Sequence, residues 1–498
     1  MVATMIRCAR INFSKLAILL GVGLLSALGT SSDARAATLY WDANGATAGT
    51  GGTGAWNTSD LAWRDGSTVG TLQAWMNNND VNLPTTAGIV TLQDDITIGQ
   101  NGATTILSGT GGYTINAVPG KSLTFDATGG TGTYRITTNV GSLTINAPVI
   151  LKGYRQNPRG TITFNGDISQ TGGAIRLEKN LFDTMTLNGN NTFDGVDLVQ
   201  GGLVVGHNSA LGANAFNWSG GTTLTAGGGD RVISNTIPGL NWNLDRTISG
   251  SNDFTFTGSY EVLSAYNTSS FASLNITAAD GQATFGNFTT LVSGTAGGFK
   301  KLGAGTMILN GIFTPGNMDM TVEGGKMLVN TTAGITSGGA DYRVTTGTLG
   351  GTGTINLGAG SVIDVSSTGS LAPGASVGTL TVNGAVLLNG TLANEFSGST
   401  TDLLAVNGNL TLGATSILDL LGVKTGSSYT IASYTGTLAG TFGTINGLGD
   451  YVIDYGTGLN SQITLQAIPA PEPSSIFLLG LGAVGVLRRV RRRRSSVA

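Results

Sequence analysis

The chain has 498 residues, of which 80 are glycine, and charged residues make up only 11%. Collagen is excluded because the glycines follow no strict three-residue period, and disorder fits poorly because apolar residues reach 40% and recur in short runs. The single cysteine, Cys8, lies in a segment that we expect to be removed, which excludes a disulfide scaffold, cysteine-ligated zinc and a cysteine nucleophile.

Charge is distributed unevenly along the chain. Residues 37–487 carry 15 basic and 27 acidic residues, a net charge of −12, whereas six arginines follow Leu487. Nucleic-acid binding needs clustered lysine and arginine against the phosphates. The acidic body therefore argues against nucleic acid as a partner.

Residues 1–36 have the composition of a secretory signal peptide. Three basic residues precede an apolar stretch of about 13 residues, and the small residues Ala34 and Ala36 flank Arg35. We expect a helical leader that signal peptidase cleaves between Ala36 and Ala37. An uncleaved membrane anchor is the alternative, although about 13 apolar residues are few for a membrane span.

Residues 37–83 contain four of the six tryptophans, Trp41, Trp56, Trp63 and Trp75. If their faces are exposed, the rings would stack on sugars and act as glycan contacts. Alternatively they cover the open end of a repeat core, because terminal repeats must be atypical and tryptophan buries a large area. We favour the second interpretation, an N-terminal cap.

Residues 84–460 repeat a short unit: a small-residue turn, a strand of apolar and threonine side chains, and an asparagine-containing turn. Gly303–Gly311 is the clearest copy. A unit this short cannot bury its own apolar face, so it must stack on the next unit. The pattern predicts an all-β solenoid, and the glycine-rich turns supply the positive φ angles that each corner needs.

The repeat spacing is 19 to 20 residues. Leu123 and Leu143 are 20 residues apart, and so are Met307 and Met327. We expect such pairs to stack in successive turns. From about residue 429 the spacing shortens and aromatic residues return, which indicates a C-terminal cap.

Two stretches resemble a known family. Leu187–Gly195, together with the following Gly202–Val205, and Lys301–Gly311 resemble the autotransporter-associated β-strand repeat, and Ser370–Leu380 resembles a phrase common near the end of such passengers. The resemblance implies a right-handed parallel β-helix in a secreted surface protein. We expect no self-translocating autotransporter, since the residues after 466 are too few for an outer-membrane barrel.

The C-terminal tail has three parts in a physically meaningful order. A proline-rich spacer (461–473) precedes a segment (474–498) that is first apolar and then arginine-rich. The arginines resist translocation and hold the apolar helix in the inner membrane. About 14 apolar residues with three glycines are few for a permanent anchor, so we expect transient membrane attachment.

This tail resembles the PEP-CTERM sorting signal. The resemblance implies a Gram-negative cell, an exosortase-type membrane protease as partner, and delivery to the cell surface or to an exopolysaccharide matrix. An ordinary tail anchor is the alternative. The residues of the predicted sorting signal are Pro471, Glu472, Pro473, Arg488, Arg489, Arg491, Arg492, Arg493 and Arg494.

Motifs for cofactors and metals are weak. The glycines at 480, 482 and 485 spell a dinucleotide fingerprint, but too few residues follow them for the fold it requires. His207 is the only histidine. Asp94, Asp95, Asp194 and Asp197 would suit Ca²⁺, yet no regular aspartate-bearing repeat recurs. We predict no cofactor and no resident metal.

Two functional hypotheses follow. The favoured one is a structural or adhesive, biofilm-associated surface protein without enzymatic activity, whose extended outer face meets matrix polysaccharide. The alternative is a carbohydrate-binding or polysaccharide-degrading β-helix, which needs charged side chains converging on adjacent turns. Arg176, Glu178 and Lys179 form the densest charged group and are its first candidates.

Overall fold

The structure, a computed structural model, describes most of the chain between Ala37 and Pro469. The described residues are 37–45, 51–99, 105–128, 134–239, 241–242, 245–264, 271–292, 298–335 and 339–469, together with Leu487 and Arg489. The predicted leader, and the predicted tail segment apart from those two residues, lie outside these ranges, so both helices remain predictions. Within the described ranges, no helix combines the length and the apolar character that crossing a bilayer takes.

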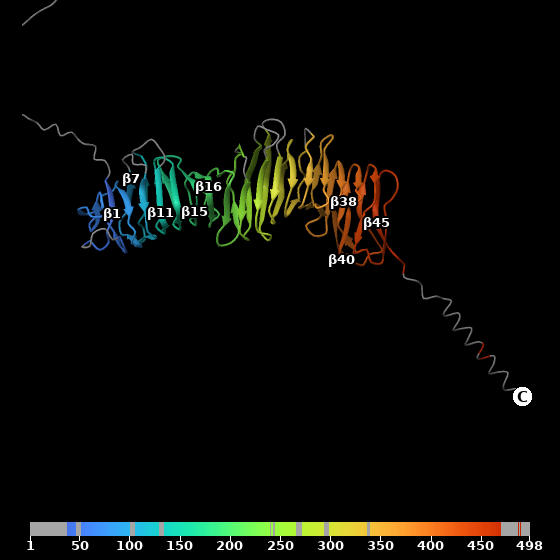
Figure 1. The fold of residues 1–498 in the computed structure, drawn as a ribbon, viewed down its shortest axis with the longest axis horizontal. Helices are drawn as coiled ribbons and strands as arrows, with labels where there is room; N and C mark the ends of the chain where they lie inside the picture. Colours follow the sequence, from blue (N-terminus) through green and yellow to red (C-terminus); the bar gives the residue numbers. More distant parts are fainter. Residues whose placement is uncertain are drawn as a thin grey trace, which may run out of the picture. The chain divides into compact units, whose positions relative to one another are not determined.

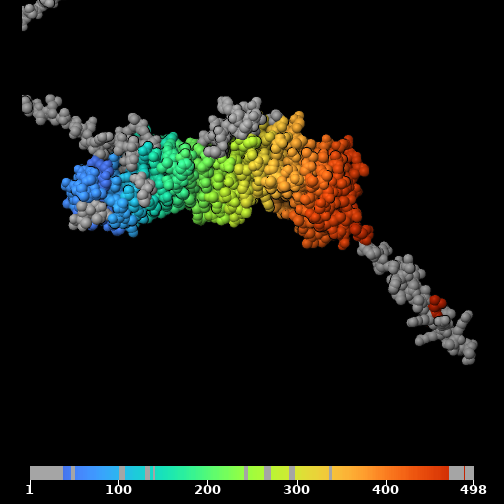
Figure 2. All heavy atoms as spheres, viewed as in Figure 1, coloured from blue at the N-terminus to red at the C-terminus, as the bar shows by residue number. Residues whose placement is uncertain are grey.

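The body is an all-β solenoid, as the repeat pattern predicts. The described residues form 45 strands, and strands of successive turns lie side by side in chain order (Figure 1). Sequence colour changes steadily along the stack, so each turn meets mainly its neighbours (Figure 2). β26 (Thr306–Thr314) pairs in parallel with β28 (Lys326–Val329), and Met307 lies opposite Met327, which confirms that predicted pair.

In the N-terminal half, each turn has three faces. β8 (Thr105–Gly109), β9 (Tyr113–Ala117) and β10 (Leu123–Asp126) follow one another along the chain. β11 (Tyr134–Ile145) serves two faces, because its first half pairs with β8 and its second half with β9. β12 (Val149–Lys152) completes the turn by pairing with β10.

This three-sided geometry corrects one predicted register. Leu123 lies opposite Val149 and does not stack on Leu143, which lies opposite Ile162 on a different face. The segments that join the strands vary in length from turn to turn. Equal spacing in the sequence therefore does not place two residues on the same face.

In the C-terminal half, a second long ladder replaces the short third face. Its path runs through β19 (Arg231–Ile233), β22 (Phe254–Ser264), β24 (Gln282–Val292), β26, β28, β30 (Thr348–Gly351), β33 (Ser370–Pro373), β36 (Thr391–Gly398), β40 (Ile417–Lys424) and β43 (Thr444–Asn446). Pairs along this path are parallel, as in the N-terminal half. The same stacking rule thus extends through the whole body.

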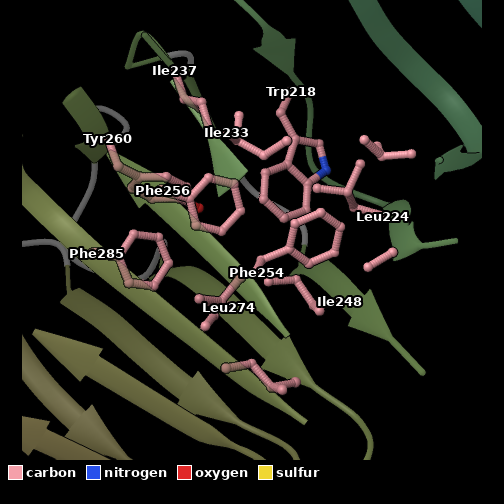
Figure 3. Packing of buried hydrophobic residues seen from close by; sticks show 14 of the residues in the cluster. Trp218, Leu224, Ile233, Ile237, Ile248, Phe254, Phe256, Tyr260, Leu274 and Phe285 are labelled. Atoms are coloured by element: carbon pink, nitrogen blue, oxygen red, sulfur yellow. The ribbon is translucent and has the colours of Figure 1, made fainter. Parts of the chain in front are cut away.

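Inside the solenoid, side chains that alternate along the strands form one apolar column. Its middle is aromatic: Phe256 and Phe285, on neighbouring turns, stack with ring centroids 5.0 Å apart. Figure 3 shows these rings with Trp218 and Tyr260 gathered in the interior. All four side chains are buried. Because such rings remove a large apolar area from water, this layer contributes strongly to stability.

Asparagine side chains form a ladder along one outer corner. Asn146 donates to Asn116 over 2.7 Å, Asn165 donates to Asn146 over 2.6 Å, and Asn188 donates to Asn165 over 2.6 Å. Each amide both donates and accepts, so one turn is linked to the next by side chains as well as by backbone. This ladder explains why asparagine follows so many of the repeat strands.

The N-terminal end is closed by antiparallel strands. β1 (Thr38–Trp41) pairs antiparallel with β3 (Leu61–Asp65), which pairs antiparallel with β4 (Leu72–Ala74). On its other edge β1 runs parallel to β5 (Asp80–Leu83), which continues the stack. A reversal of strand direction at the end of a stack limits further edge pairing.

The C-terminal end is closed in the same way, and it corrects the predicted start of the spacer. β45 (Ser461–Ala467) runs antiparallel to β41 (Ser428–Tyr434) and to β44 (Tyr451–Asp454). Ile463 and Leu465 are fully buried. Residues 461–467 are therefore a strand of the folded body, because their apolar residues alternate with polar ones and reach the core.

Candidate functional site

The four N-terminal tryptophans lie inside the solenoid. Trp41, Trp56 and Trp63 are 0% exposed and Trp75 is 1% exposed. Trp63 is central, with ring centroids 5.0 Å from Trp41, 4.7 Å from Trp56 and 4.8 Å from Trp75. No face of these rings is available to a sugar, so the glycan-contact interpretation does not fit, because the rings fill the core beneath β1 and β3.

A charged network lies on the outer face of the solenoid near its N-terminal half. The strands that carry it are β11, β13 (Gln156–Phe164), β15 (Arg176–Leu187), β16 (Gly195–Val205) and β17 (Asn217–Trp218). Arg135 lies opposite Asn157, Glu178 opposite Asp197, and Asp197 opposite Asn217. Outward-facing polar residues of successive turns are thus brought into one row.

Arg176 is the most constrained member of this network. Its guanidinium donates to Asp197 over 2.8 Å, to Asp194 over 3.0 Å, and to the carbonyl oxygens of Val196 and Ala215 over 2.9 and 2.8 Å. The side chain is 17% exposed. A planar fork with several donors suits this role, since one side chain can bridge two turns.

Arg155 and Glu178 form the more open part of the network. Arg155 is 47% exposed at its side chain and contacts Glu178 and Asp197, the latter over 3.2 Å. Glu178 also accepts from the side-chain amides of Asn157, over 3.0 Å, and Asn180, over 2.7 Å. Arg159 donates to the oxygen of Asn157 over 3.3 Å, which brings three polar residues around Asn157.

The structure separates Lys179 from the charged group that the sequence predicts. Lys179 is buried with 0% exposure and donates inward to the carbonyl oxygen of Leu181. Burial lowers its pKa, because desolvation disfavours the charged form. Neighbouring residues of a strand face opposite sides, so Lys179 could not share a face with Glu178.

Sequence reasoning missed Arg155, Arg159 and Asn157 as members of this network. The available signal was the stacking itself: Arg155 precedes Arg176 by about one turn, as Glu178 precedes Asp197. The register could not be read from the sequence, however, because a turn here varies in length and contains bulges.

The network is arranged for cross-bracing rather than for proton transfer. The carboxylates of Glu178, Asp194 and Asp197 each accept at least two side-chain hydrogen bonds. A general acid or base needs a carboxyl group that is free to reach a substrate proton. The geometry therefore links turns and leaves the arginines at its margin for outside contacts.

A second group of charges lies in a small hollow of about 80 Å³ on the C-terminal half, lined by Lys326, Glu395 and Asp402 among others. Burial raises the pKa of Asp402 to about 6. Its carboxylate accepts from the backbone N–H groups of Gly378, over 2.7 Å, and Glu395, over 2.8 Å. This carboxyl group therefore holds two loops in place.

No group of three or more histidine, cysteine, aspartate or glutamate side chains in the described ranges is arranged to hold a metal ion. Asp94 and Asp95 instead accept from Thr58 and Ser122 on adjacent segments. Backbone and side-chain donation from Thr58 lowers the pKa of Asp94.

Taken with its tail, the body defines a class: an exported β-solenoid protein that is sorted to the cell surface. Residues 469–493 match the PEP-CTERM protein-sorting motif. The predicted sorting signal is thereby confirmed, and such a motif indicates processing by an exosortase-type system.

A curated relative is the adhesin BmaC autotransporter of Brucella suis biovar 1 (strain 1330). The two are 32% identical over 287 residues, which are 56% of this chain and 7% of the relative. The chain thus matches a small part of the length of that protein. The similarity agrees with the resemblance of the repeats to those of autotransporter passengers.

Proposed function

We propose that this chain is a structural and adhesive protein of the surface or extracellular matrix of a Gram-negative bacterium. Signal peptidase removes the leader, the apolar tail holds the protein transiently in the inner membrane, and an exosortase-type protease then processes it. The observation that carries the proposal is the direct succession of a closed solenoid, ending at β45, and the PEP-CTERM motif from residue 469. The name of the relative, an adhesin, supports the adhesive part.

The outer face formed by β11, β13 and β15 is the part of the solenoid that we assign to exopolysaccharide. Six of the body's 15 basic residues lie between Arg135 and Lys179, a stretch with two acidic residues, although the body as a whole is acidic. Arginine forks bind carboxylates with two parallel hydrogen bonds. This face therefore suits a polysaccharide that carries carboxylate groups.

Polysaccharide degradation at the same face is the weaker alternative. The carboxylates of Glu178 and Asp197 are occupied by arginine and asparagine donors on neighbouring turns. Glycoside hydrolysis uses one carboxyl group as an acid and a second as a base or nucleophile. Both would have to leave their present partners before they could act.

Changing Arg155 and Arg159 together to glutamine is expected to weaken binding to polygalacturonate about tenfold, roughly 1.4 kcal/mol, because two cationic forks are removed. Binding is measured with the full-length protein on immobilised polygalacturonate, with neutral dextran as a second surface. Arg343→Gln is the matched control, since Arg343 is 44% exposed and is also paired with two aspartates. Equal binding to dextran, or an unchanged double variant, would contradict the assignment of this face.

A further inference from the structure

The beginning of the solenoid contains a carboxyl group without a partner. Asp80, the first residue of β5, is 4% exposed, and its Oδ1 has no hydrogen-bond partner. Burial raises its pKa to about 6, and no nearby charge offsets this effect. A buried carboxylate without a partner is costly, so the site needs an explanation.

The missing partner can be identified from the neighbouring strand. The backbone N–H of Asp80 donates to the carbonyl oxygen of Ala37 over 3.0 Å, and Thr38 lies opposite Asp80 in the parallel pair of β1 and β5. The nitrogen of Ala37 donates to Oδ1 of Asn79 over 3.0 Å. Asn79 is 7% exposed, and its side-chain nitrogen is fixed on the carbonyl oxygen of Met76 over 3.0 Å, which turns its oxygen toward Ala37.

Ala37 is also the first residue that remains after the expected signal-peptide cleavage. Before cleavage its nitrogen is a peptide N–H with one hydrogen to donate. After cleavage it is an α-ammonium group with a positive charge and three hydrogens. One hydrogen suffices for Asn79, and the charge then lies beside the segment that holds the unpartnered carboxylate of Asp80.

We propose that Asn79 and Asp80 form a receptor for the α-ammonium group of Ala37, so that cleavage of the leader locks the first strand onto the solenoid. This inference rests on the proposed export and cleavage of the chain. The exported protein gains a buried ion pair that the uncleaved chain lacks. A buried charge pair is strongly destabilised when one partner is removed, so the lock is specific to the cleaved form.

The test compares two forms of the protein, one that begins at Ala37 and one with a Gly-Ser extension before it, each with Asp80 or with Asp80→Asn. In the form that begins at Ala37, D80N is expected to lower the Tm at pH 7.5, because the α-ammonium loses its counter-ion. In the extended form D80N is expected to raise the Tm, since a buried carboxylate without a partner is removed. Asp65→Asn, at an exposed position of β3, is the control and should act alike in both.

A second measurement reports on the amine itself. An ion pair with Asp80 raises the pKa of the α-amino group, so its acylation at neutral pH should be about tenfold slower than in the extended form, and D80N should abolish the difference. A D80N effect of the same sign in both forms, or equal acylation rates, would overturn the proposal. N-terminal sequencing of the exported protein separates the two levels: a different first residue refutes the lock but leaves surface delivery intact.

Discussion

Deletion of residues 469–498 is expected to abolish delivery of the protein to the cell surface and to leave the solenoid folded. The last strand, β45, ends at Ala467, so the deletion removes the PEP-CTERM motif without removing any strand of the body. Cell fractionation and antibody binding to intact cells measure the location, and circular dichroism of the purified protein measures the fold. We expect the surface signal to fall at least about tenfold, because a missorted chain has no route to the outer surface.

The contribution of the motif itself is tested by a smaller change. Replacement of Pro471, Glu472 and Pro473 by alanine keeps the apolar segment and the arginines. The protein should then accumulate in the inner membrane, because these remaining parts still stop translocation. Surface delivery of either variant at the wild-type level would show that the tail does not sort the protein.

Trp63→Ala is expected to cost about 3–5 kcal/mol of stability and to unfold the first turns of the solenoid. Trp63 is fully buried and contacts three other tryptophan rings, so its removal leaves a cavity at the end of the core. The denaturation midpoint and the rate of proteolysis near the N-terminus measure the effect. In a stacked-repeat protein each turn depends on its neighbours, so the loss should spread from this end.

Phe182→Ala is the matched control for the tryptophan variant. Phe182 is also aromatic, but it is 83% exposed at a turn within β15. Its truncation should change stability by less than about 0.5 kcal/mol, as is usual for surface positions. A tryptophan variant as stable as this control would contradict the buried cluster as the anchor of the N-terminal end.

The sequence predicts the solenoid well because its physical signal is local. Alternation within a strand and a glycine or asparagine at the turn recur in each copy, and Met307 on Met327 follows directly from a spacing of 20 residues. The register fails where the joining segments differ in length. Leu123 and Leu143 have the same spacing but lie on different faces, since the turn that contains Leu123 is longer.

The charged network shows the same limit at the level of a site. Arg176 and Glu178 are visible in the sequence as a charged group, yet the partners Arg155 and Asp197 come from other turns and depend on the register. The inward direction of Lys179 could have been predicted from strand alternation. The sorting motif, in contrast, is a linear signal, and it needs no folded neighbour to be recognised.

The most direct test of the account uses the absence of cysteine from the chain after residue 36, which allows a single introduced thiol to report on folding and location together. Phe182→Cys places the thiol at a position with 83% exposure, and Leu187→Cys places it at a fully buried position of the same strand. With a membrane-impermeant maleimide on intact cells, we expect Phe182→Cys to react and Leu187→Cys to react only after denaturation. Equal labelling of both variants would contradict the solenoid, and labelling of Phe182→Cys only after lysis would contradict its place at the cell surface.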